Sequence, residues 1–207
     1  MKQMKHLKRN IVLNKNLIIF LTLLGIIGII AGTVLSIILD SKDAALVTEY
    51  LNNFINNINL NKLNYGNSLL NCLITNIGTS IFVWLLGFSI IGIPLILIIY
   101  FSKTFILGFT ISSIIINYKL KGCLLAFIYV FPHLVINIFN IVFLSMYALS
   151  ISFKMFNIII KKETFNFKNI TNKYLIVLFI SILGFTITSF FEVYVTPLLL
   201  KMIIKIL

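Results

Sequence analysis

A few polar and ionisable side chains interrupt the long apolar segments of this chain. The ones whose types could do chemistry are Asn76, His133, Asn137 and Glu192. His133 and Asn137 are four residues apart, with Asn140 three further on, so a helix would place them on one face. At about 1.5 Å per helical residue, Asn76, His133 and Glu192 fall at similar depths in the outer half of a bilayer. Polar groups at that depth normally face the bundle interior and bond one another, which predicts an intramembrane polar cluster.

The first interpretation of this cluster is a structural set of hydrogen bonds that fixes how the helices pack. A proton or ion relay and a docking site for a partner helix are the alternatives. One histidine and one glutamate do not make a metal site, and HExxH, nucleophile-elbow and Walker patterns are missing from the sequence. Cys72 and Cys123 have no CxxC spacing and are interpreted as small packing residues. We therefore predict no enzyme activity, no cofactor, no metal and no nucleic-acid partner.

The composition requires a lipid environment for these residues. The chain has 207 residues, of which 60% are hydrophobic and 11% are charged. A soluble domain has about a quarter of its residues charged, so this chain cannot cover a water-exposed surface. It is predicted to be one integral membrane domain over 1–207, an all-α polytopic transmembrane bundle.

The apolar segments predict how often the chain crosses the bilayer. A crossing helix needs about 20 residues, and three segments each supply one: 17–39, 123–150 and 175–200. The run 69–116 has one charged side chain and the length of two crossings. Gly92 and Pro94 offer a break within it, because proline lacks the backbone donor and glycine is flexible. The pair Ser102–Lys103 offers another.

The distribution of basic residues predicts the orientation. Cytoplasmic flanks are rich in Lys and Arg, and 1–16 and 151–174 carry five each. The segment 40–68 balances two lysines against three acidic residues and is assigned to the outer side. An even number of crossings must then separate the two basic segments. Five crossings follow, with the N-terminus inside and the C-terminus outside.

This orientation gives Lys103 an expected place. If the chain reverses near the inner face between Gly92 and Ser102, Lys103 lies at that reversal, where its long stem lets the ammonium reach the headgroups. No carboxylate is expected at the same depth to pair with it. The alternative is a buried lysine on an ion path.

Two further surfaces are candidates for contacts. The outer segment places apolar residues at helical spacing, which predicts an amphipathic helix on the outer leaflet: Ala44, Val47, Leu51, Phe54 and Ile58. Val47, Leu51, Phe54 and Ile58 would form a docking surface for an outer partner, or the helix would simply connect two crossings. Gly28, Gly32 and Ser36 recur every four residues, a pattern that permits close helix approach. Either another helix of this chain or a second copy in a homo-oligomer would satisfy it.

The arrangement of these features resembles the stage II sporulation protein M family over nearly the whole chain. The resemblance rests on a basic N-terminus, one helix, an outer segment of some thirty residues, and three local patterns. They are Gly87–Gly92–Pro94 in G-x-x-x-x-G-x-P, Lys103–Gly108–Phe109 in K-x-x-x-x-G-F, and the pair Pro132–His133. Wider relatives tend to carry a glutamate four residues after the histidine, where this chain has Asn137.

The resemblance implies a role in endospore formation. It implies a location in the mother-cell membrane at the septum, where the protein anchors two extracytoplasmic peptidoglycan-cutting enzymes, sporulation proteins D and P, during engulfment. It also implies that the chain has no catalytic site. The competing hypothesis is a small-solute or ion permease that uses a broken helix at Gly92–Pro94 together with the polar cluster.

Overall fold

Helices make up nearly all of the computed structural model, which describes residues 15–60, 62–131, 133–161 and 167–204. The helices are α2 (Lys15–Ile37), α3 (Ser41–Asn59), α4 (Tyr65–Leu86), α5 (Gly92–Val130), α6 (His133–Lys161), α7 (Phe167–Phe190) and α8 (Thr196–Ile204). A short π-helix, η1 (Phe191–Val195), joins α7 to α8. The predicted all-α fold is confirmed.

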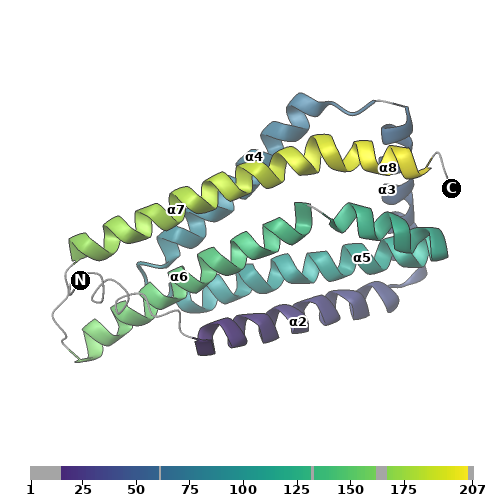
Figure 1. Ribbon diagram of the computed structural model, residues 1–207. Coiled ribbons are helices and arrows are strands. Elements are labelled where there is room, and N and C mark those ends of the chain that lie inside the picture. Colours follow the sequence, from purple (N-terminus) through teal and green to yellow (C-terminus); the bar gives the residue numbers. More distant parts are fainter. Residues whose placement is uncertain (1–14, 61, 132, 162–166, 205–207) are drawn as a thin grey trace.

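Five segments of the described chain are long and apolar enough to cross a bilayer. They are α2, α4, α5, most of α6, and the continuous stretch from α7 through α8. Figure 1 shows these segments running side by side along one axis, with α2 beginning at one end and α8 finishing at the other. The predicted five crossings are therefore confirmed.

The reversal between the second and third crossings lies earlier than the sequence suggested. The helix α4 ends at Leu86 and α5 begins at Gly92, so the turn occupies 87–91. Pro94 then stands in the first turn of α5, where its missing N–H costs no helical hydrogen bond. Gly92 packs on the backbone of Leu86, which leaves no room for a Cβ. The predicted breaks at Gly92–Pro94 and Ser102–Lys103 are wrong, because Gly92–Pro94 starts a helix and 102–103 continue it.

The helix α5 has a second reversal, which lies between the predicted apolar segments 69–116 and 123–150. Lys119 has φ 52° and ψ −127°, the single positive φ among the described non-glycine residues. After it, Gly122 packs on the backbone of Ile114 and Ile115. In a straight helix, eight residues would separate Gly122 from Ile114 by about 12 Å. The limb 120–130 therefore folds back on the limb 92–118 at the end of the bundle where α8 finishes (Figure 1).

The small residues of α2 lie against α5. Gly28 faces the side chain of Thr104, and Gly32 faces the backbone of Phe105 and Phe109. From the other side, Gly108 faces the backbone of Ile29. One turn further along α2, the hydroxyls of Ser36 and Ser112 hydrogen-bond. Of the two interpretations of this stripe, contact within the chain is the one observed.

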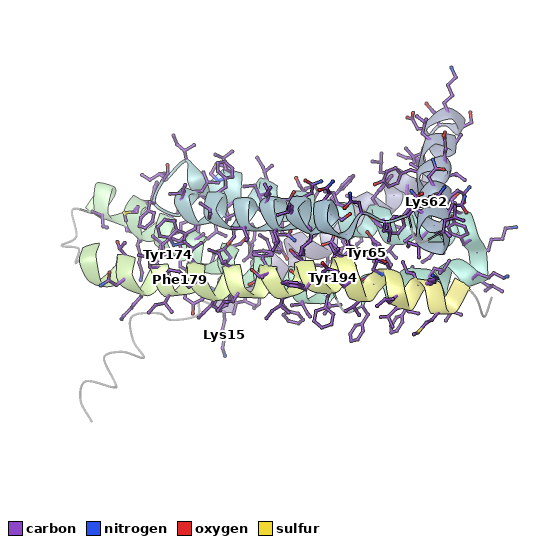
Figure 2. The ribbon with its side chains drawn as sticks, turned by 90° about the horizontal axis from the view of Figure 1, so that it is seen from above. Lys15, Lys62, Tyr65, Tyr174, Phe179 and Tyr194 are labelled. Atoms are coloured by element: carbon purple, nitrogen blue, oxygen red, sulfur yellow. The ribbon has the colours of Figure 1, made fainter. Side chains whose placement is uncertain are left out.

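The helix α3 lies across the end of the bundle at which α8 finishes and projects beyond it (Figures 1 and 2). Figure 2 shows Lys15, at the start of α2, toward the opposite end from Lys62, which follows α3. The interior of the bundle is centred on the buried side chains of Leu21, Ile96, Tyr100, Leu144 and Phe185. A second, smaller apolar cluster lies beneath α3.

Candidate functional site

The centre of the predicted polar cluster is a chain of hydrogen bonds between α4 and the end of α7. The Cys72 thiol donates to a carboxylate oxygen of Glu192 over 3.0 Å. The Asn76 amide donates to the Cys72 sulfur over 3.3 Å and to the Ser189 hydroxyl over 3.0 Å. Asn76 is only 4% exposed, so these bonds satisfy an amide that would otherwise be buried without partners.

The local helices explain why these side chains meet. Cys72 and Asn76 are four residues apart on α4 and therefore share one face. Glu192 lies in η1, where the helix widens by one residue per turn. The hydroxyl of Thr196 donates to the carbonyl of Phe191 over 3.1 Å within this widened turn. The π-helix thus occurs where the last crossing carries its carboxylate.

His133 joins the same region from α6. It is 1% exposed, and its Nδ1 lies 3.0 Å from the Thr196 hydroxyl. The Tyr129 ring packs edge-on against it, with ring centres 5.3 Å apart. Thr196 thereby connects His133 to the π-helix that carries Glu192.

The two asparagines that follow His133 on α6 have different places. Asn137 is half-buried, and among the described residues no hydrogen bond joins it to Asn76, His133 or Glu192. Asn140 donates to the carbonyl of Ser181 over 2.8 Å and packs on Gly184, tying α6 to α7 below the cluster. The structure places Asn76, His133 and Glu192 in one region, whereas Asn137 is not bonded to them among the described residues.

Lys103 is part of this region and not of the inner reversal. It stands eleven residues after Gly92, about 17 Å along α5. It is half-buried and within electrostatic range of Glu192 and Cys72. The predicted position beside the reversal is wrong, because the chain turns at 87–91. The expectation that no carboxylate lies at its depth is wrong as well.

The arrangement brings opposite charges and hydrogen-bonding groups from four crossings together inside the bundle. Lys103 lies within electrostatic range of Glu192, the Cys72 thiol donates to the Glu192 carboxylate, and the Asn76 amide donates in turn to the Cys72 sulfur. In the described part of the chain, no three His, Cys, Asp or Glu side chains lie close enough to hold a metal ion. The contacts that are present link α4, α5, α6 and the last crossing.

The predicted docking stripe on α3 faces the bundle. Ile58 is 2% exposed, and Leu51 and Phe54 pack with it on the limbs of α5 and on α8. The rings of Phe54 and Tyr129 meet edge-on at 6.3 Å. Val47 lines a cavity on the same side of α3. The prediction that Val47, Leu51, Phe54 and Ile58 offer a free docking surface is wrong, because the folded-back α5 supplies the apolar surface that covers them.

The family comparison agrees with this architecture. A family model described as Stage II sporulation protein M matches residues 17–197. The chain belongs to this family. It is therefore a multi-pass membrane protein of sporulation. Searches of curated proteins and of solved structures returned no match.

Several residues of the stage II sporulation protein M pattern occupy points of close contact. Gly87 packs on the Tyr174 hydroxyl and the backbone of Ala148. That hydroxyl donates to the carbonyl of Trp84 over 2.9 Å, while the Trp84 indole donates to the carbonyl of Tyr174 over 3.1 Å. Figure 2 shows Tyr174 well away from Tyr194, on the same crossing. The absence of a side chain at Gly87 leaves room for Tyr174, whose ring and backbone form this pair of hydrogen bonds with Trp84.

Sequence reasoning missed three members of the polar region. Cys72 was assigned to packing, yet it donates to Glu192. Ser189 and Thr196 were not singled out, although both receive or share hydrogen bonds there. The four-residue spacings Cys72–Asn76 and Glu192–Thr196 could have indicated this, because residues four apart share one face of a helix. Pro132 lies outside the described residues.

Proposed function

We propose that this chain is a non-enzymatic membrane scaffold that anchors peptidoglycan-degrading enzymes, sporulation proteins D and P, during engulfment. The proposed location is the mother-cell membrane at the sporulation septum. The family membership supports a role in sporulation, and the helical bundle supports a protein held in the membrane. The enzymes act on the outer side, so the scaffold must offer them a fixed surface there.

The observation that carries this proposal is the attachment of α3 to the bundle. The Thr48 hydroxyl donates to the Asn117 side chain over 2.5 Å, and the Tyr118 hydroxyl donates to the Asn52 side chain over 2.7 Å. Ile58 is buried at the far end of the same helix. These contacts hold α3 along its length, so its remaining face is a preformed surface on the outer side of the membrane.

The exposed side of α3, which begins with Tyr50 at the rim of the contact with α5, is the proposed docking surface. Tyr50, Asn53 and Asn57 are exposed and recur at three- and four-residue spacing. Tyr50 is 75% exposed, and a tyrosine combines a large apolar ring with a hydrogen-bonding tip, the type that dominates many interfaces. This surface replaces the buried stripe that the sequence suggested.

Affinity capture from sporulating cells tests the proposal. The full chain carries Tyr50→Ala and Asn53→Arg, with Lys62→Ala as the matched control on an exposed residue of the same outer segment. We expect normal membrane abundance for both, and loss of the co-purifying cell-wall hydrolases only for the double variant. Retention of the hydrolases by the double variant would move docking to the membrane helices. Absence of hydrolases from the unmodified protein would contradict the scaffold itself.

A permease is the second candidate, and the polar region is the observation that favours it. The broken helix at Gly92–Pro94 no longer supports it, but Lys103, Glu192 and His133 place ionisable groups in the bundle interior. Proton flux into vesicles reconstituted with the purified chain, lost on Glu192→Ala, would favour this function. If vesicles that contain the chain take up protons no faster than vesicles without protein, the permease function is excluded.

A further inference from the structure

A cavity of about 480 Å³ lies beneath α3, between that helix, both limbs of α5, and α8. Leu51, Phe54, Ile114, Leu125 and Leu200 are among its lining residues, and none of the described lining residues is charged. The volume lies within the range of about 300–1,000 Å³ that is typical of ligand sites. The cavity is therefore large enough for a ligand and accepts an apolar one.

One polar group in this lining has no partner. Ser113 is 4% exposed, and its hydroxyl makes no hydrogen bond to the described chain. Its neighbour Thr110, also in the lining, donates to the carbonyl of Ile106 over 2.8 Å, as helical hydroxyls in apolar surroundings normally do. A buried hydroxyl without a partner is uncommon and costs free energy. An occupant with a hydrogen-bond acceptor would satisfy Ser113.

The position of the cavity selects the occupant. Ser113 lies 21 residues after Gly92, about 32 Å along α5, close to the outer limit of a hydrocarbon core about 30 Å thick. The lining on this limb runs from Phe109 to Tyr118, about 14 Å, so it straddles this boundary: about 6 Å lies on the hydrocarbon side of Ser113 and about 8 Å lies beyond it. Lipid ester groups lie at this boundary, with their chains on the apolar side.

The rim of the cavity is open to the surroundings of the bundle. Leu46 and Tyr50 belong to the lining and are 64% and 75% exposed. Figure 2 shows α3 projecting beyond the bundle. Tyr129 and Leu200 form part of the inner wall of the cavity. Leu200 is 4% exposed. A chain entering here leaves the bulk lipid and becomes enclosed by protein.

We propose that this cavity binds one acyl chain of an outer-leaflet phospholipid, and that the Ser113 hydroxyl donates a hydrogen bond to the ester carbonyl of that chain. The bound lipid fills the space between α3 and the limbs of α5, where a void would otherwise separate them. This proposal does not rest on the scaffold function, although Tyr50 belongs both to the cavity rim and to the proposed docking surface.

The first test is photolabelling of the full chain in nanodiscs of phosphatidylethanolamine and phosphatidylglycerol. The probe is phosphatidylglycerol with a diazirine in the middle of one acyl chain. We expect label enriched on peptides 44–55 and 109–118 over peptide 19–30, which contains lipid-facing residues of α2. Equal labelling of the three peptides would mean ordinary lipid contact and would overturn the proposal. Crosslinks from the cavity peptides to a second copy of the chain, in place of lipid, would overturn it too.

The second test measures phospholipid retained by the chain in mild detergent, by native mass spectrometry. Ser113→Ala removes one hydrogen bond, so we expect about a fivefold drop in retained lipid. The control is Ser145→Ala, because Ser145 is also buried without a partner but does not line the cavity. Val47→Phe should lower retention because the larger ring occupies part of the cavity, whereas Val34→Phe, at an exposed site on α2, should not. Retention unchanged in both Ser113→Ala and Val47→Phe would overturn the assignment.

Discussion

Two ionisable side chains of opposite charge, Lys103 and Glu192, lie in the polar region of the bundle. Lys103 and Glu192 come from different crossings and lie within electrostatic range of each other. Removing one member of such a pair leaves the other charge uncompensated, whereas replacing both with neutral groups often costs little. The stability of the protein should therefore depend on the pair and not on either charge alone.

A double-mutant cycle tests this dependence. We expect Glu192→Gln to lower the thermal stability of the purified chain in detergent, by about 1 kcal/mol or more. Lys103→Met combined with Glu192→Gln should recover much of the loss, because no charge then remains unpaired. Thermal unfolding followed by circular dichroism gives the comparison. If the double variant is as unstable as the sum of the two single variants, the two side chains act independently.

At the scale of helices, the contact between α2 and α5 depends on glycine. A Cβ at Gly32 would meet the backbone of Phe105 and Phe109, which cannot rotate away. Gly32→Ala should therefore destabilise the bundle by about 1–3 kcal/mol, as overpacking does. Gly78→Ala is the matched control, because nothing lies within 4 Å of its Cβ position and alanine favours a helix. Equal melting temperatures for the two variants would show that α2 shifts without cost.

The inward face of α3 gives a second test at this scale. Replacing Leu51 and Phe54 with serine removes apolar contacts with α5 and α8. We expect faster cleavage of segment 40–68 by a protease added from outside, together with a lower melting temperature. Asn53→Ser, on the exposed face of the same helix, should change neither. An unchanged cleavage rate in the first variant would mean that the hydrogen bonds of Thr48 and Asn52 suffice to hold α3.

The helices also show which features a sequence pattern can predict. Runs of apolar residues and the spacing of Val47, Leu51, Phe54 and Ile58 correctly predicted the crossings and an amphipathic α3. The same spacing could not say what covers the apolar face, because the limb 120–130 depends on the backbone of one residue, Lys119. The gap between the segments 69–116 and 123–150 placed a turn there, but lysine has no particular preference for positive φ, so the sequence did not show that the limb after it would pack under α3.

The polar site was predictable in part for a similar reason. Counting residues from the ends of the apolar segments gave similar depths for Asn76, His133 and Glu192, and the structure places them in one region. It misplaced Lys103, because an error of several residues in the position of a reversal moves every later residue along the helix. The role of Cys72 depends on Glu192, which is 120 residues away, and no local pattern contains that contact.

At the scale of the whole molecule, the odd number of crossings fixes the relation between the two ends. Reporters fused after Lys62 and at Leu207 should be active outside, and one fused after Lys162 should be active inside. These outcomes follow from the excess of basic residues in 1–16 and 151–174, which retains both segments in the cytoplasm. A reporter active outside after Lys162 would reverse this assignment and place α3 on a different side from the one proposed.

The pairing of α2 with α5 has a consequence for biosynthesis. The ribosome completes α2 at Ile37, but the α5 limb that receives it ends at Tyr118, 81 residues later. At about 5–20 residues per second, α2 waits roughly 4–16 s in the bilayer without its main neighbour. A segment that must remain inserted alone needs strong partitioning into lipid, and α2 has the highest mean hydropathy of the five crossings, 2.7. The high hydropathy of α2 therefore suits a helix that must stay inserted in the bilayer on its own until α5 has been synthesised.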